Sequence, residues 1–135
     1  MIIKKTTALG DIAVNESVIA KAIIKSALEA GDRIFPATEK GKIIGTYKKI
    51  GTGDLSGHFE FEETGNKYKI VFYTVIIFGS SIKSVTETVL DELQNKMQTM
   101  FPEYGGELIL KIVGVKSKNV AERNIEVKRE YEPAG

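Results

Sequence analysis

The sequence predicts a single small α/β (α+β) domain in which a mixed β-sheet carries two helices packed on one face. Residues 68–78 form the longest run of β-branched and aromatic side chains, which is typical of a central strand covered on both sides. Residues 82–101 and 18–30 each repeat apolar side chains at helical spacing. The expected order over the 135 residues is strand, helix, two strands, helix and strand, followed by a C-terminal tail strand.

The N-terminal part of the chain is expected to fold as a short strand followed by a helix. Residues 10–14 have the composition of a strand. The apolar stripe of the helix that follows consists of Val18, Ile19, Ala22, Ile23, Ser26, Ala27 and Ala30. Lys21, Lys25 and Glu29 fall on the other side of this helix, and Gly31 stands where a left-handed residue usually ends a helix.

The middle of the chain divides into an irregular insertion and a hairpin. Between residues 32 and 57 glycines are frequent and apolar runs are short, so we expect weak edge strands and loop there. Residues 59–62 alternate strictly between aromatic and acidic side chains, and residues 63–67 have the composition of a turn. Together they predict a β-hairpin that pairs with the central strand.

The central strand is joined to the second helix through one glycine. Gly79 breaks the strand, and Ser80 or Ser81 can cap the helix by accepting a backbone N–H bond. Pro102 cannot continue the helical ladder, so the helix should end before it. We expect Gly79 to have a positive φ or a close backbone neighbour, because a Cβ would crowd this structural turn.

Two more strands are expected after the second helix. Gly105 and Gly106 predict a flexible corner before a strand at residues 107–113. In the C-terminal extension, residues 116–135, the segment 124–131 alternates again. One side of this candidate assembly strand carries Ile125, Val127, Arg129 and Tyr131. Such a strand returns to its own sheet or adds to that of a neighbouring molecule, and we favour the second outcome, a joint between copies.

Composition narrows the class of protein. The chain is 42% hydrophobic and 27% charged, as in soluble globular domains, and its net charge of +1 argues against a strongly electrostatic partner for the protein as a whole. Without cysteine there is no disulfide, thiolate zinc site or cysteine nucleophile. No segment reaches the roughly 18–20 apolar residues that a membrane helix requires, and the N-terminus lacks the apolar run of a signal. We therefore expect a cytoplasmic protein with no direct membrane insertion.

Three segments carry a resemblance to a known family. Residues 10–21 (GDIAVNESVIAK), 75–85 (VIIFGSSIKSV) and 108–115 (LILKIVGV) resemble the opening strand and helix, the strand–turn–helix and the closing strand of the bacterial alkaline shock protein family. The resemblance implies a non-enzymatic, self-associating scaffold linked to cell-envelope stress and homeostasis in Gram-positive bacteria. It also implies a homo-oligomer that is peripheral to the inner face of the membrane through a membrane-anchored protein partner.

A lysine-rich part of the insertion gives an alternative function. Lys40, Lys42, Lys48 and Lys49 surround Tyr47, and such a set can bind nucleic acid because cations neutralise phosphates while an aromatic face stacks on a base. Solvated lysines on a loop are the more frequent case, so nucleic acid is the alternative partner rather than the preferred one. A contiguous basic stripe would favour nucleic acid, whereas scattered lysines beside an apolar edge would favour assembly.

The glycine-rich segment 51–57 gives a minor alternative, the binding of a small anionic ligand by backbone N–H groups. Its spacing matches no phosphate-binding fingerprint. His58, the only histidine, has no second ligand or nucleophile beside it in the sequence and is interpreted as structural or solvated. Glu60 and Glu62 share the polar side of an alternating strand. The sequence therefore predicts no catalytic residue, no metal site and no cofactor.

Overall fold

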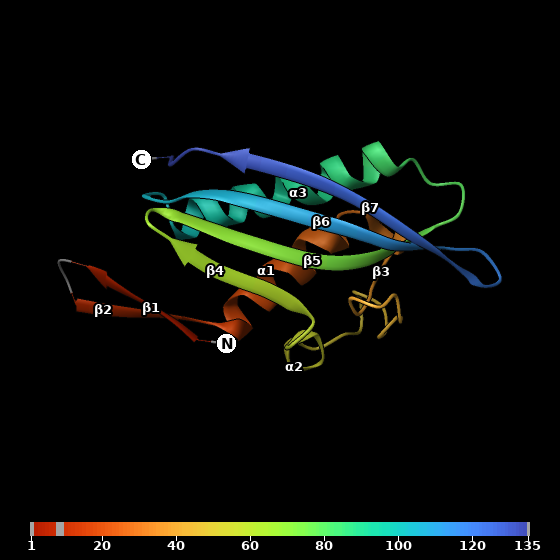
Figure 1. The fold of residues 1–135 in the computed structure, drawn as a ribbon, viewed down its shortest axis with the longest axis horizontal. Helices are drawn as coiled ribbons and strands as arrows, with labels where there is room; N and C mark the ends of the chain where they lie inside the picture. Colours follow the sequence, from red (N-terminus) through yellow and green to blue (C-terminus); the bar gives the residue numbers. More distant parts are fainter. Residues whose placement is uncertain (1, 8–9, 135) are drawn as a thin grey trace.

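The computed structural model describes residues 2–7 and 10–134 (Figure 1). The strands are β1 (Ile2–Thr7), β2 (Gly10–Asn15), β3 (Ile34–Pro36), β4 (Phe59–Thr64), β5 (Lys67–Ile77), β6 (Gly105–Lys116) and β7 (Val120–Tyr131). The helices are α1 (Glu16–Leu28), α2 (Thr52–Leu55) and α3 (Ile82–Met100), with a 3₁₀ turn, η1 (Gly31–Arg33). The fold is a mixed α/β arrangement in one small domain, which confirms the predicted class.

Five of the strands form one mixed sheet with β5 at its centre. The strand order is β3-β5-β6-β7, and β4 also pairs with β5. β6 runs parallel to β5 along one edge, because α3 carries the chain back before β6 begins, and β7 is antiparallel to β6. On the other edge of β5, β4 pairs with the first half and β3 with the second half. β1 and β2 form a separate antiparallel pair.

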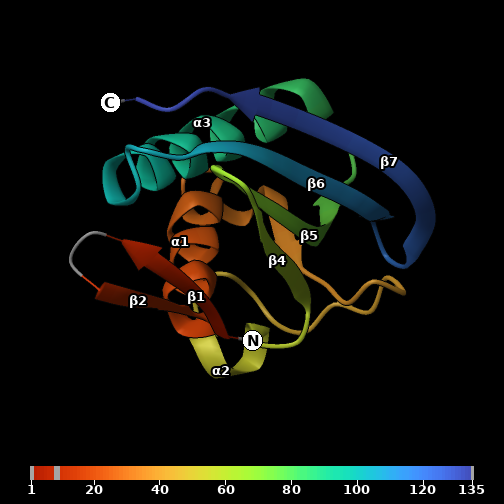
Figure 2. The ribbon, with the colours of Figure 1, turned by 60° about the vertical axis from the view of Figure 1, so that its left-hand side comes forward.

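α1 and α3 cover the same face of this sheet and pack against each other (Figures 1 and 2). Alternate side chains of β5 point toward the helices, which is the period-2 geometry of a strand. The fully buried residues of this core include Ile19, Ile23, Tyr68, Ile70, Phe72, Ile76, Leu93, Met97 and Leu108. None of the described helices combines the length and the apolar character needed to cross a membrane.

The junction between β5 and α3 has the geometry that the sequence predicts. Gly79 has a φ of +90°, a conformation that side chains with a Cβ rarely adopt, although no atom lies close to where a Cβ would be. The hydroxyl of Ser81 accepts a hydrogen bond of 3.1 Å from the N–H of Ser84 and caps the helix. The prediction of a positive φ at Gly79 is therefore confirmed.

The prediction of a flexible corner at Gly105 and Gly106 is wrong. Both glycines are buried at the start of β6. Gly106 pairs with Tyr131 of β7, and a Cβ on Gly106 would collide with the Tyr131 ring. The second glycine is present because the ring of an aromatic residue occupies the space that a side chain would need, which is a recurring way of packing glycine in a sheet.

Two further expectations about local structure are corrected. β1 was not predicted, and α2 lies within a segment expected to be loop, where it places Leu55 in the core at 1% exposure. Val18, assigned to the buried stripe of α1, is 38% exposed. The buried stripe is centred instead on Ile19 and Ile23, both fully buried.

The opposite face of the sheet carries a small apolar cluster bordered by charges. Val71, Tyr73 and Ile109 are buried there, and Val113 packs against them. The insertion passes beside this cluster, since a Cβ on Gly41 would lie 3.5 Å from the Val113 carbonyl oxygen. Exposed ion pairs across the strands border the cluster, namely Lys69–Glu62, Lys69–Glu107, Lys128–Glu107 and Lys111–Glu126, at 3.8 to 4.0 Å. Each such pair contributes at most about 1 kcal/mol, because water screens it.

Candidate interaction surfaces

β7 is the last strand of the sheet and pairs through one edge only. Its twelve residues run antiparallel to β6, and no other strand of residues 2–7 and 10–134 pairs with its outer edge. The pairing shifts register between Ile112 and Gly114 of β6, so the ladder is regular over Ile125 to Tyr131 of β7 and, in a second register, over Val120 to Glu122. An edge of this kind leaves N–H and C=O groups available to another strand.

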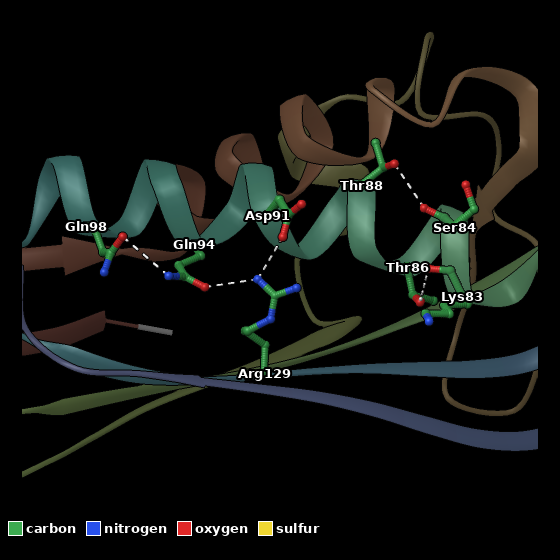
Figure 3. A network of polar contacts seen from close by, with 8 residues as sticks. All are labelled: Lys83, Ser84, Thr86, Thr88, Asp91, Gln94, Gln98 and Arg129. Carbon is green, nitrogen blue, oxygen red and sulfur yellow. Dashed lines mark hydrogen bonds and ion pairs between the residues drawn. The ribbon is translucent and has the colours of Figure 1, made fainter.

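The four side chains of the predicted assembly strand face the helices of their own molecule. Ile125 and Val127 pack against the core, and Tyr131 is buried in it. Arg129 donates a hydrogen bond of 3.0 Å to the side-chain oxygen of Gln94 and forms an ion pair of 2.9 Å with Asp91, both on α3 (Figure 3). The expectation that this strand leaves its own sheet is therefore wrong. It pairs with β6, and its apolar side packs in the core against α3.

The lysines of the candidate nucleic-acid patch do not gather in one place. Lys40 lines a hollow on the sheet side with Glu39 and Glu60, whereas Lys48 lines a groove beside α1. Lys42 and Lys49 are exposed on the insertion. Tyr47 is only 3% exposed and belongs to the core, and burial raises the pKa of its hydroxyl. The aromatic face that was expected to stack on a base is thus not available, which corrects this part of the alternative.

Two of the three glycines in the segment 51–57 already donate their backbone N–H groups to carboxylates of the protein. The N–H of Gly51 donates to Oδ2 of Asp54 at 3.0 Å, and the N–H of Gly57 donates to Oε1 of Glu16 at 2.8 Å. An anion at either position would have to displace a negative side chain. The structure therefore does not support an anion site at Gly51 or Gly57, since the first donor closes the N-terminal turn of α2 and the second joins the segment after α2 to α1.

His58 lies in a hollow that the sequence does not reveal. The hollow has a volume of about 370 Å³ and is also lined by Glu39, Lys40, Glu60 and Tyr73. The Tyr73 hydroxyl donates a hydrogen bond of 2.8 Å to Glu60, and burial together with this carboxylate raises the pKa of Tyr73. Among the described residues, no group of three or more side chains has the arrangement of a metal site. The bond between Tyr73 and Glu60 joins β5 to β4, so we interpret it as structural.

A groove follows the exposed side of α1 in the helical layer. Toward α3 it is a hollow of about 480 Å³ lined by Val18, Lys21 and Met100 among others. Toward the insertion it continues as a hollow of about 650 Å³, which shares Val18 and Lys21 and reaches Leu28 and Lys48. The charged residues of this groove are all lysines, and three of its apolar residues, Val18, Leu28 and Met100, are exposed. Only the lysines on the outside of the helix were visible in the sequence pattern.

Comparisons of the chain with protein-family models, with curated proteins and with solved structures give no match.

Proposed function

We propose that this protein is a self-associating interaction protein whose copies join through the outer edge of β7. The observation that carries the proposal is the single pairing of β7, a strand of twelve residues with one open edge among the described residues. The apolar side of the strand is buried by α3, so the joint is made by the backbone edge and not by an exposed apolar arm. The resemblance to the alkaline shock protein family supports the same kind of function, a scaffold at the inner side of the cell envelope.

The charges of β7 favour one symmetric register. In a two-fold antiparallel pair centred on Val127, Glu126 of each copy stands opposite Lys128 of the other, and the two Val127 residues meet on the axis. Centring the pair on Glu126, Lys128 or Arg129 would place identical charges opposite each other on the axis. Because like charges directly opposite in a sheet are destabilising, the register centred on Val127 is preferred over these three, and it is the register in which Glu126 and Lys128 meet.

The test is a charge exchange at the proposed joint. The molar mass of the full chain in solution should be twice that of one copy. Glu126→Lys and Lys128→Glu should each shift the equilibrium toward the monomer, because each places like charges opposite each other. The double variant restores opposite charges in the same register and should restore the dimer. Light scattering after size-exclusion chromatography measures the mass, and thermal melting checks that each variant is folded.

Two results would contradict the proposal. One is a full-length chain that stays monomeric at concentrations of several hundred micromolar. The other is a double variant that is no more dimeric than the single ones, which would show that the two side chains do not meet across an axis. Within one copy, Glu126 pairs with Lys111 at 4.0 Å and Lys128 pairs with Glu107 at 3.9 Å. Because the variants also break these weak pairs, a small loss of stability by itself does not test the dimer.

A further inference from the structure

We infer that the groove along α1 is a second binding site, and that it takes an acidic amphipathic helix of a partner protein. α1 packs on α3 and β4 and lies on the helical layer (Figure 2), so the site does not depend on the edge of β7. Both the charge and the apolar character of the groove lead to this ligand.

Three of the four lysines of the groove form no ion pair with an acidic side chain of the described part of the chain. Lys21 and Lys25 are one helical turn apart on α1 and both are exposed. Lys48 is exposed on the wall that the insertion provides. The fourth lysine of the groove differs, because Lys96 is already paired with Glu92 at 3.9 Å. Three cations around one groove favour a ligand with carboxylates on both of its edges.

The apolar part of the groove lies between these lysines. Val18 and Leu28 of α1 are 38% and 42% exposed, and Met100 at the end of α3 is 39% exposed. Methionine adapts its shape to different partners, which suits an interface that must accept a side chain from outside. An occupant that places leucine-like side chains over these residues would remove them from water, which is the main source of affinity in helix-in-groove recognition.

The shape of the groove distinguishes this ligand from two others. A flat lipid surface would contact the most exposed residues of the groove and leave its half-buried residues, such as Ile24 and Ile50, uncovered. A nucleic acid strand would need an exposed aromatic face, and the tyrosine of this groove, Tyr47, is 3% exposed. A helix fits the concave form, and the stretch of α1 from Ser17 to Leu28 extends about 17 Å at 1.5 Å per residue, about three helical turns.

The probe that tests the inference is a fluorescein-labelled peptide of about 18 residues made of leucine, alanine and glutamate. Leucines occupy one helical face and glutamates border it. Fluorescence anisotropy should show saturable binding to the full chain that weakens with added salt. Lys21→Glu combined with Lys25→Glu should raise the dissociation constant at least about tenfold, and Leu28→Gln combined with Met100→Gln should also raise it.

A protein variant, a second peptide and a vesicle sedimentation assay are the controls. Lys83→Glu with Lys118→Glu changes the net charge equally at exposed residues outside the groove and should leave the affinity within about twofold. A peptide of the same composition without an apolar face should not bind. The inference is overturned if the designed peptide does not bind, if the Lys83 and Lys118 variant loses binding to the same extent, or if the protein sediments with anionic vesicles but ignores the peptide.

Discussion

The packing of Tyr131 over Gly106 allows a test of how firmly β7 is held. In Gly106→Ala the new methyl group would occupy the space of the Tyr131 ring, which belongs to the core and is 7% exposed. If the surroundings relax, the overpacking costs about 1–3 kcal/mol. If the ring is expelled, the loss approaches about 4 kcal/mol, from roughly 150 Å² or more of aromatic surface at about 25 cal/mol per Å². We expect a loss of about 3 kcal/mol.

Urea denaturation measures the free energy of unfolding, and for a chain of this length a loss of 3 kcal/mol corresponds to a fall in melting temperature of about 10 °C. Gly53→Ala is the matched control, since Gly53 has no positive φ and no atom near the position of a Cβ. Because alanine is favoured over glycine in a helix, this control should be neutral or stabilising by up to about 1 kcal/mol.

A double-mutant cycle identifies the cause of the expected loss. Tyr131→Ala should itself cost about 3–5 kcal/mol, because it removes an aromatic ring from the core. In that background Gly106→Ala should cost almost nothing, since the colliding ring is gone, and the coupling energy should be about 2–3 kcal/mol. Equal costs of Gly106→Ala in both backgrounds, or a single variant as stable as the unchanged protein, would refute the proposed packing.

Four other predictions concern stability. Gly79→Ala should cost about 1–2 kcal/mol in urea denaturation because of the positive φ, and an unchanged midpoint would contradict that reasoning. Tyr47→Phe should be neutral or stabilising, because the buried hydroxyl makes no hydrogen bond of standard geometry and has only the Thr74 side chain near it; a clear destabilisation would show that this contact is a bond. Removing residues 124–135 should unfold the protein rather than yield a folded monomer, which circular dichroism would show. Burial, and to a smaller extent the nearby Tyr68, raises the pKa of Tyr131 to about 12 from an ordinary value of 10.0. Between these values the unfolded chain binds fewer protons than the folded one, so stability should fall as the pH rises through this range and fall less steeply in Tyr131→Phe.

The elements that the sequence predicts correctly are those with a long regular pattern. β5 and α3 are recognised because eleven and nineteen residues repeat their character at the strand and helix periods. The turn at Gly79 is recognised because a glycine between two such elements has few alternative explanations. The β4–β5 hairpin is recognised because its strands and turn are adjacent in sequence, so that local composition contains the whole unit.

The features that the sequence does not predict depend on residues far apart in the chain. The role of Gly106 is set by Tyr131, twenty-five positions later, and a pair of glycines by itself indicates only flexibility. Tyr47 stands among lysines, a composition typical of surface, yet the insertion turns its ring into the core. α2 has four residues, too few for a helical period to be visible. The groove along α1 combines three separate segments, so no local pattern identifies it.

The division of one edge of β5 between β4 and β3 has a consequence for the order of folding. The β4–β5 hairpin closes between Thr64 and Lys67, whereas β3 must bring Ile34 to Ile76 across a loop of about forty residues. The entropy of closing the longer loop exceeds that of the shorter by about 2 kcal/mol. The first half of β5 should therefore be paired on this edge early, and the second half only when the insertion docks. Amide protons around Val75 should then become protected from hydrogen exchange late in refolding and lose that protection first on partial unfolding. The insertion would thus be the last segment to dock on the sheet.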